Sequence, residues 1–329
     1  MANGMLVQAN APGYLGQLFQ TSRRPNTLLK LLGGVQGSVM STTSPEFPIG
    51  VYYALRAPSQ PANLEGALAP AAQYRTVNQS TNVVQIFHEK VSLSYMAESN
   101  KVISGIVPIP QGTVNGPAVN PRDPEWQVLT ALETIAQDCN YSFLNGAYQN
   151  PADASTTALK TRGVMNAIVT NSLDKSADVS PTPVQYRAYI NLLLQNVIQT
   201  TGFEVDQTWA LFAGVQEFNN IAAAYEAQGT IYIEPESVAF GVKVRKILTR
   251  FGTVMLTLDP DMPAQYFAVL NIGIMGIVGL DVPGKGILFE EQLAKVGSSN
   301  DSQIYGQLGV AHGPEYFHGK LKVPTGLAY

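Results

Sequence analysis

The sequence of 329 residues offers few groups of side chains whose types and spacing suit catalysis or ligand binding. The clearest is the stretch 279–286, GLDVPGKG, which falls one residue short of a phosphate-binding loop. The missing residue is the Ser or Thr that follows the lysine and ligates magnesium, and Pro283 fits such a loop poorly. We therefore favour a turn between two strands, and a phosphate-loop nucleotide-binding enzyme is a remote alternative.

Three further groups of residues could bind a metal or react. Asp259 and Asp261 flank a proline and could hold a divalent cation, but no other acid follows in the next 19 residues, which favours a solvated Asp-Pro turn. His312 and His318 lack a nearby cysteine or acid cluster, so they are predicted to be hydrogen-bonded core or turn residues. Cys139 lies on an apolar helical stripe and is predicted to pack in the core. We predict no catalytic, metal or cofactor site and expect the protein not to be an enzyme.

The secondary structure that must position these residues changes in character at about residue 120. Residues 1–120 hold 11 Gly and 10 Pro with a net charge of +3, and beyond a helical turn or two at 28–32 they show one clear strand, 85–97. In that strand Val91, Leu93 and Tyr95 share a face. Residues 121–329 carry a net charge of −7 and show capped, amphipathic helices followed by strands, which indicates an α+β fold.

Apolar spacing and capping residues define the predicted helices. They span 123–146, where Asp123 can cap and Gly146 ends the stripe, then 182–202 after a Thr182 cap, and 206–229 with Leu211 and Val215 on its apolar face. Strands are predicted at 230–234, 242–246, 253–258 and 265–272, largely antiparallel.

The composition favours a protein that buries much of its surface against copies of itself. There are 20 Lys and Arg against 24 Asp and Glu, a net charge of −4, and only 13% of residues are charged, about half the usual share. A net negative chain is not a sequence-independent nucleic-acid binder with a basic stripe, and one cysteine excludes an internal disulfide. The most apolar run, 266–280, contains Asn271 and is shorter than the roughly 20 residues that span a bilayer. Without a secretory signal at the N-terminus, we expect a soluble, cytoplasmic chain with no membrane partner.

Five segments together resemble the major capsid (major head) proteins of tailed bacteriophages, which have the Hong Kong 97-type fold. They are NVVQIFHEKVSLS at 82–94, FLNG at 143–146, FGTVMLTLDPDMP at 251–263, LAKVGSS at 293–299 and IYGQLGVAHGPEYFHGKL at 304–321. The matches are short, but they occur in the family's order over most of residues 80–325.

The resemblance implies a phage-capsid (Hong Kong 97-type) layout with an N-terminal arm, an extended loop, a long spine helix, and peripheral and axial domains. The implied divisions are the arm at 1–45, the extended loop at 46–100, the peripheral domain with the spine helix at 101–154, the axial domain at 155–285, and a return to the peripheral domain at 286–329. Arm and loop would reach over neighbouring subunits.

The function that the resemblance implies is structural. Copies would assemble as pentamers and hexamers into an icosahedral shell around double-stranded DNA, with no cofactor. A separate scaffolding protein and a portal would be partners, with assembly in the host cytoplasm and a final place in the virion capsid. The net charge of −4 favours non-specific containment of DNA by a closed wall, although the positive arm leaves open a contact of Arg23 and Arg24 with DNA. A phage tail-tube or decoration protein is the alternative, but it would lack a spine helix beside an extended loop.

Four aromatic residues are predicted to anchor the extended loop on a neighbouring subunit: Phe47, Tyr52, Tyr53 and Phe87. Exposed aromatic side chains in an extended segment need a partner surface. Packing against their own subunit is the alternative.

Overall fold

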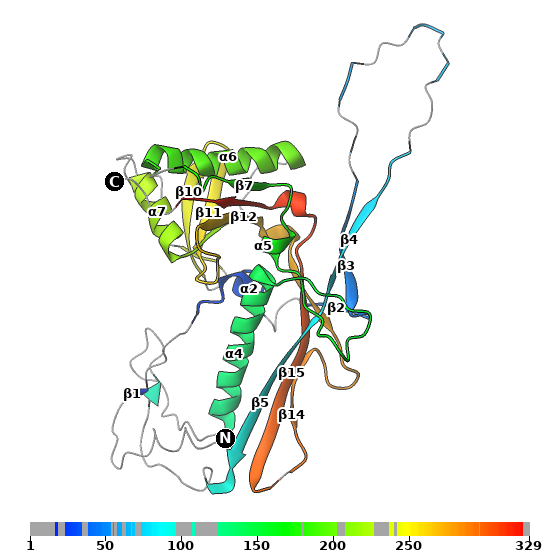
Figure 1. The fold of residues 1–329 in the computed structure, drawn as a ribbon, viewed down its shortest axis with the longest axis vertical. Coiled ribbons are helices and arrows are strands. Elements are labelled where there is room, and N and C mark those ends of the chain that lie inside the picture. Colours follow the sequence, from blue (N-terminus) through cyan, green and yellow to red (C-terminus); the bar gives the residue numbers. More distant parts are fainter. Residues whose placement is uncertain are drawn as a thin grey trace.

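The computed structural model describes residues 17–18, 24–34, 39–53, 55, 58–60, 64–66, 68–69, 74–96, 107–108, 124–178, 181–202, 208–226, 237–239, 242–295 and 297–324. These residues form two main sheets, a long helix and a projecting hairpin (Figure 1). A further short pair joins β1 (Gln17–Leu18) to β6 (Val107–Pro108) in parallel.

One unit is built on a seven-stranded sheet. Its strands, in spatial order, are β7 (Ser172–Asp174), β16 (Gly319–Lys322), β12 (Tyr266–Asn271), β8 (Trp209–Ala213), β11 (Gly252–Leu258), β10 (Val242–Thr249) and β9 (Ser237–Ala239). The pairs β7–β16 and β8–β11 are parallel and the other pairs are antiparallel. The sheet is therefore largely antiparallel, as predicted from the sequence. The helices α6 (Pro183–Thr201) and α7 (Val215–Glu226) cover one face, with Leu193, Leu211 and Phe267 in the shared core.

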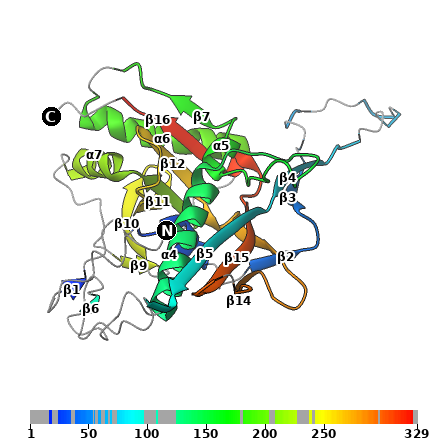
Figure 2. The ribbon, with the colours of Figure 1, turned by 60° about the horizontal axis from the view of Figure 1, so that its bottom comes forward.

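The second unit is a five-stranded sheet with a helix on it. The sheet contains β14 (Leu288–Gln292), β15 (Ser299–Ala311), β13 (Gly276–Leu280), β2 (Val39–Thr42) and β5 (Gln85–Ser94), which pairs with β15 over its full length. The helix α4 (Pro124–Asn145) lies along β5 and β15 (Figure 2). The rings of Phe87 on β5 and Phe143 on α4 meet edge to face with centroids 6.4 Å apart.

The core under α4 continues to the other face of the seven-stranded sheet. Phe212 of β8 and Leu270 of β12 are buried in the same cluster as Phe143, together with α2 (Thr27–Leu31) and α5 (Val164–Ala167). The central strands of the seven-stranded sheet are thus covered on both faces, by α6 and α7 on one side and by α2, α4 and α5 on the other.

The helices predicted at 123–146 and 182–202 are confirmed as α4 and α6. On α4 the predicted stripe of Ile135, Cys139 and Phe143 is buried, while the predicted cap at residue 123 lies outside the described residues. The α6 helix begins with a capping box between Thr182 and Gln185 and ends at a residue in the left-handed region, Gly202 (φ 72°). The predicted helical turn at 28–32 is confirmed as α2.

The helix predicted over 206–229 is wrong in its first half. Residues Trp209–Ala213 form β8, in which all five side chains are buried between β11 and β12. Leu211 therefore belongs to a strand, and Val215 is an exposed residue at the start of α7. A central strand that is buried on both faces gives a continuous apolar run, and the spacing of apolar residues alone does not distinguish that run from the first turns of the helix that follows it.

The predicted strands at 242–246, 253–258 and 265–272 are confirmed as β10, β11 and β12, and the strand at 230–234 lies outside the described residues. In β5 the side chains of Val91 and Leu93 are buried, but Tyr95 follows the strand and is exposed. The apolar run 266–280 is strand and loop, as predicted, and it passes from β12 through a 3-10 turn into β13 of the other sheet. Within the described ranges, every helix is too short or too polar to cross a lipid bilayer.

Candidate assembly surfaces

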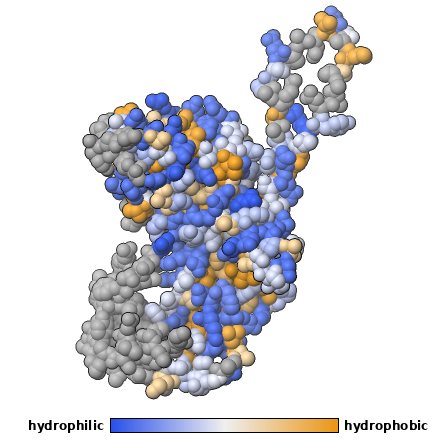
Figure 3. Space-filling view, in the orientation of Figure 1, coloured by the Kyte–Doolittle hydropathy of each residue, from blue (hydrophilic) through white to orange (hydrophobic). Residues whose placement is uncertain are grey.

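An extended loop projects from the body on two paired strands, β3 (Glu46–Tyr52) and β4 (Asn78–Val83) (Figure 1). Its described residues include large apolar side chains in contact with water: Leu68 is 96% exposed and Tyr74 is 94% exposed, and Leu64 is nearly as open. Apolar residues gather at the tip of this loop in the space-filling view (Figure 3). Apolar side chains grouped on a projecting segment indicate an interaction surface.

The four predicted anchor residues do not share one environment. Phe47 is buried beside β13 and β15, and Phe87 is buried against Phe143 in the core of its own chain. Tyr52 is half-buried, with its ring centroid 5.3 Å from that of Tyr316. These placements agree with the alternative of packing within the subunit. Tyr53 alone of the four is exposed, and its contact with a neighbour stays a prediction.

The sequence reasoning missed the loop's other apolar residues, Leu64, Leu68 and Tyr74. Their surroundings are rich in Ala, Pro and Gln and show neither a helical nor a strand period. The available signal was the presence of large apolar side chains in a segment that could form no core of its own.

The two aspartates after β11 are buried, so the predicted solvated turn is wrong. The Nδ2 group of Asn140 on α4 donates to Oδ2 of Asp261 at 2.7 Å and lies 3.3 Å from Oδ2 of Asp259. The backbone N–H of Asp261 also donates to Oδ1 of Asp259 at 3.0 Å. Carboxylates can be buried when donors surround them, and here the amide donor, Asn140, comes from a helix 119 residues earlier in the chain.

The short helix α2 supplies further donors to this cluster. The N–H of Leu28 donates to Oδ2 of Asp259 at 3.4 Å, and the N–H of Leu29 donates to Oδ1 of Asn140 at 3.1 Å. Amides in the first turn of a helix have no partner within that helix, so side-chain acceptors must satisfy them. The cluster therefore holds α2 against both α4 and the end of β11.

Arg24 completes the cluster, which we call the polar junction and define as Arg24, Asn140, Asp259 and Asp261. The Arg24 guanidinium is half-exposed and forms an ion pair with Asp261. One cation faces two carboxylates, and burial raises the pKa of Asp259 above its ordinary range. Arg24 is engaged by Asp261 and Arg23 lies outside the described residues, so a contact of the arm with DNA stays a prediction.

The polar junction has the geometry of a structural contact. Its carboxylate oxygens already accept hydrogen bonds from an amide, two backbone N–H groups and a guanidinium. Within the described ranges, no three His, Cys, Asp or Glu side chains are grouped so that they could hold a metal ion.

The two histidines lie where the chain passes from β15 to β16, between the two sheets. The Nε2 of His318 lies 2.6 Å from the carbonyl oxygen of His312, and its Nδ1 accepts from the N–H of Asn271 at 3.2 Å. This arrangement requires the neutral ring with the proton on Nε2. Burial lowers the pKa of both His312 and His318 to about 4. The prediction of a hydrogen-bonded core histidine is confirmed for His318.

The phosphate-loop candidate is a turn between strands, as favoured from the sequence. Residues 281–287 connect β13 to β14, with a bridge between Val282 and Gly286. A strand follows the turn, so the helix whose first amides would hold a phosphate is missing from this stretch of the described chain. Lys285 donates to Oε1 of Glu291 at 2.7 Å.

Cys139 is fully buried, and burial raises its pKa well above the ordinary value, so the thiol is a core group as predicted.

The fold is shared with solved shell-forming proteins. The encapsulin SrpI of Synechococcus elongatus PCC 7942 matches with a TM-score of 0.60 at 13% identity, covering 99% of this chain and 97% of that one. The capsid of a native GTA particle matches with a TM-score of 0.60 at 13% identity, covering 96% and 98%. The capsid of cyanophage A-1(L) matches with a TM-score of 0.62 at 13% identity, covering 94% and 96%. No curated protein matches the chain in sequence.

A long helix beside a long sheet, a projecting loop and a helix-covered second sheet, matched over nearly the whole length, define the HK97-like capsid fold. The family model of the SU10 major capsid protein matches residues 1–327, and the chain belongs to that family. It is a major capsid protein of a phage and a component of the virion capsid, in a family of structural, non-enzymatic proteins.

Proposed function

We propose that copies of this chain assemble as pentamers and hexamers into a closed icosahedral shell that encloses double-stranded DNA. The observation that carries the proposal is the extended loop, which projects from the body (Figure 1) and whose described large apolar side chains are exposed to water. Burying Leu64, Leu68 and Tyr74 on a neighbour would remove this apolar surface from water. The family membership supports self-assembly as the way in which they become buried.

The same loop can link every subunit of a shell to the next. Interfaces of permanent assemblies bury about 2,000–5,000 Å² or more, and contacts that are individually weak become stable when several must break together. A loop, an arm and two flanks on each subunit would supply several contacts at once. We thus propose that assembly depends on many non-covalent interfaces and involves no chemical reaction.

We assign the seven-stranded unit to the axial domain, near the fivefold and sixfold axes, and the five-stranded unit with α4 to the peripheral domain. Residues 1–45 are proposed as the arm and 46–100 as the segment carrying the extended loop. This assignment places β13 in the peripheral unit and β16 in the axial unit, because each pairs with strands of that sheet. The sequence divisions at 155–285 and 286–329 placed these two strands the other way round.

The proposed partners follow from shell assembly. A separate scaffolding protein and a portal would guide closure in the host cytoplasm, and the genome would be held without sequence recognition. The net charge of −4 supports containment over neutralisation of DNA. Loss of DNA from closed shells after Arg23→Gln would instead indicate a direct contact from the arm. The corresponding change at Arg24 would also disturb the polar junction.

Electron microscopy of the purified protein, expressed with and without its scaffolding protein, tests the proposal. We expect closed shells with fivefold vertices, and shells isolated from phage should hold nuclease-resistant double-stranded DNA. The variant Leu64→Asp with Leu68→Asp should leave folded subunits that assemble poorly, while Ala158→Asp, at an exposed residue of the body, serves as the matched control. Tubes, or small particles in all conditions, would refute assembly into a closed shell.

A further inference from the structure

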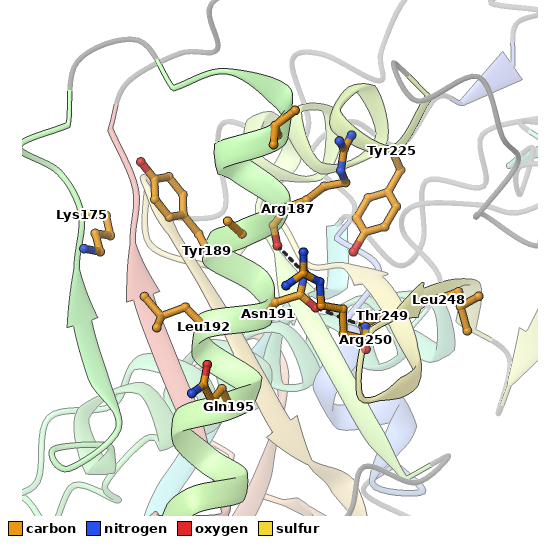
Figure 4. Close-up of a pocket in the computed structure, with 12 residues that line it drawn as sticks. Lys175, Arg187, Tyr189, Asn191, Leu192, Gln195, Tyr225, Leu248, Thr249 and Arg250 are labelled. Atoms are coloured by element: carbon orange, nitrogen blue, oxygen red, sulfur yellow. Dashed lines mark hydrogen bonds between the residues drawn. The ribbon is translucent and has the colours of Figure 1, made fainter.

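An open groove of about 670 Å³ runs along the outer side of α6 (Figure 4). We call it the α6 groove. It is bounded by α6, by Lys175, which follows β7, and by the turn between β10 and β11. Its lining residues are Lys175, Val184, Arg187, Ala188, Tyr189, Asn191, Leu192, Gln195, Tyr225, Leu248, Thr249 and Arg250.

The side chains that line the α6 groove carry positive charge, and one acid, Asp178, meets the lining through a hydrogen bond from the hydroxyl group of Tyr189. Lys175, Arg187 and Arg250 line it, and none of its lining residues is acidic. Arg187 also donates to the carbonyl oxygen of Ala224 in the last turn of α7, which fixes its side chain. In a chain with only 20 Lys and Arg among 329 residues, three cations around one groove are a marked local concentration.

Hydrogen bonds hold one wall of the groove, the β10–β11 turn, in place. The side chain of Asn191 donates to the carbonyl oxygen of Arg187 at 3.0 Å and accepts from the N–H of Arg250 at 3.3 Å. The β10–β11 turn is thereby fixed to α6, and Figure 4 shows both bonds. A wall that is already fixed loses little conformational entropy when a partner contacts it.

The groove is also apolar at its rim. Val184 is 66% exposed and Leu248 is 52% exposed, and Leu192 is exposed on the same side of α6 as Val184, two helical turns away. Nucleic-acid interfaces are predominantly polar, whereas protein interfaces combine apolar contacts with complementary charges. An acidic protein surface that carries apolar side chains fits the α6 groove better than DNA does.

A second copy of the chain offers such a surface. Without the three groove cations the chain would hold 17 Lys and Arg against 24 Asp and Glu. The outer side of α4 is a described example, since the 22-residue helix contains no Lys or Arg and exposes acidic residues beside apolar ones: Glu125, Leu129, Glu133, Asp138 and Tyr141. This helix lies across the seven-stranded sheet from α6, so the groove cannot receive it from its own chain.

We propose that the α6 groove seats an acidic, apolar-bearing surface of a second copy, and so forms one of the contacts between neighbouring subunits. The inference rests on the proposed function, because it needs copies that assemble. It adds a defined receiving surface on the α6 side of the subunit, separate from the projecting loop.

Photo-crosslinking tests which molecule occupies the groove. A photoreactive amino acid is placed at Leu248 or at Gln195, with Ala158 as the exposed control position, and assembled shells are irradiated. We expect a crosslinked dimer of the chain from both groove positions, with the second peptide identified by mass spectrometry. Shells that form normally but give no chain-to-chain crosslink would overturn the proposal while leaving the proposed function intact. Crosslinks only to a scaffolding protein or to DNA would overturn it in favour of that occupant.

Charge reversal tests whether the cations matter to assembly. Arg250→Glu and Lys175→Glu should each lower the yield of shells by more than about tenfold at physiological salt, because like charges would then face each other across the contact. Lys160→Glu reverses an exposed cation outside the groove and should assemble as the wild type does. Fluorescence of the buried Trp209 confirms that each variant is folded. Wild-type yields from both groove variants would overturn the proposal.

Discussion

Replacing Asn140 by alanine should destabilise the subunit more than any other single truncation of an amide on α4. Asn140 donates to Asp261 at 2.7 Å, lies within hydrogen-bond distance of both Asp259 oxygens, and accepts from the N–H of Leu29. The variant leaves two carboxylates buried side by side, with Arg24 as the remaining cation, and leaves the Leu29 amide without its acceptor.

The expected loss of unfolding free energy is about 3–5 kcal/mol at pH 7. Removing one partner from a buried charged cluster typically costs about 3–5 kcal/mol, and an orphaned buried N–H costs about 1–3 kcal/mol. Leaving the Asp259 carboxylate without its donor cannot cost more free energy than protonating that carboxylate would. Bringing an acid of ordinary pKa 3.8 to its neutral form at pH 7 costs about 4 kcal/mol.

Because protonation of Asp259 sets this limit, the loss of stability in the Asn140→Ala variant should depend on pH. Burial raises the pKa of Asp259 in the wild type, and loss of the Asn140 donor should raise it further. A raised pKa in the folded state means that stability is present at low pH and is lost as the pH rises through that pKa. The destabilisation should therefore be smaller at pH 5 than at pH 7.

Urea unfolding of unassembled subunits at pH 7 and pH 5, followed by the fluorescence of buried Trp209, measures both effects. Tyr141→Ala, at the next position of α4 and on an exposed side chain, is the matched control and should cost less than about 1 kcal/mol. A loss below 1 kcal/mol for Asn140→Ala, or a loss that grows as the pH falls, would refute the account of the polar junction.

Four further outcomes are expected. Cys139, fully buried, should resist maleimide in the folded protein and react in urea, and rapid labelling of the native chain would contradict its place in the core. Thr182→Ala should cost about 1 kcal/mol in urea unfolding because it removes the capping box of α6, and no change would show that the box is unimportant. Burial lowers the pKa of His318 to about 4, so its contribution to stability is present above pH 6.5 and lost as the pH falls toward 4; a wild-type urea midpoint that is flat from pH 6.5 to 4 would argue against this. Lys285→Ala breaks a surface ion pair with Glu291 and should change stability by less than about 1 kcal/mol, with ATP binding no different from wild type.

The sequence predicted those elements whose signals are local. The apolar stripe of α4 repeats at helical spacing, and a Thr182 cap marks the start of α6, so the structure reproduces both helices. The β8 strand was missed for a physical reason. Each of its residues is buried, which removes the alternation that distinguishes a strand, and α7 begins only two residues after it ends.

The polar junction could not be predicted from local spacing. Asp259 and Asp261 are followed by no third acid for 19 residues, a pattern typical of an exposed turn. Their partners on α4 and α2 lie 119 and 231 residues away. Only the fold brings these donors together, and the fold thereby turns two apparently solvated acids into the attachment point of α2.

The low charge content of the chain has a structural explanation in this arrangement. Burying a charge without a partner costs several kcal/mol, so surfaces that are covered by neighbouring copies favour apolar and amide side chains. The extended loop, which we propose to be covered by a neighbouring copy, follows this rule with Leu64, Leu68 and Tyr74. The α6 groove departs from it by keeping three cations beside exposed apolar residues. In a subunit that otherwise replaces charges at its contacts, cations retained on such a surface are best explained by acids that meet them from another copy.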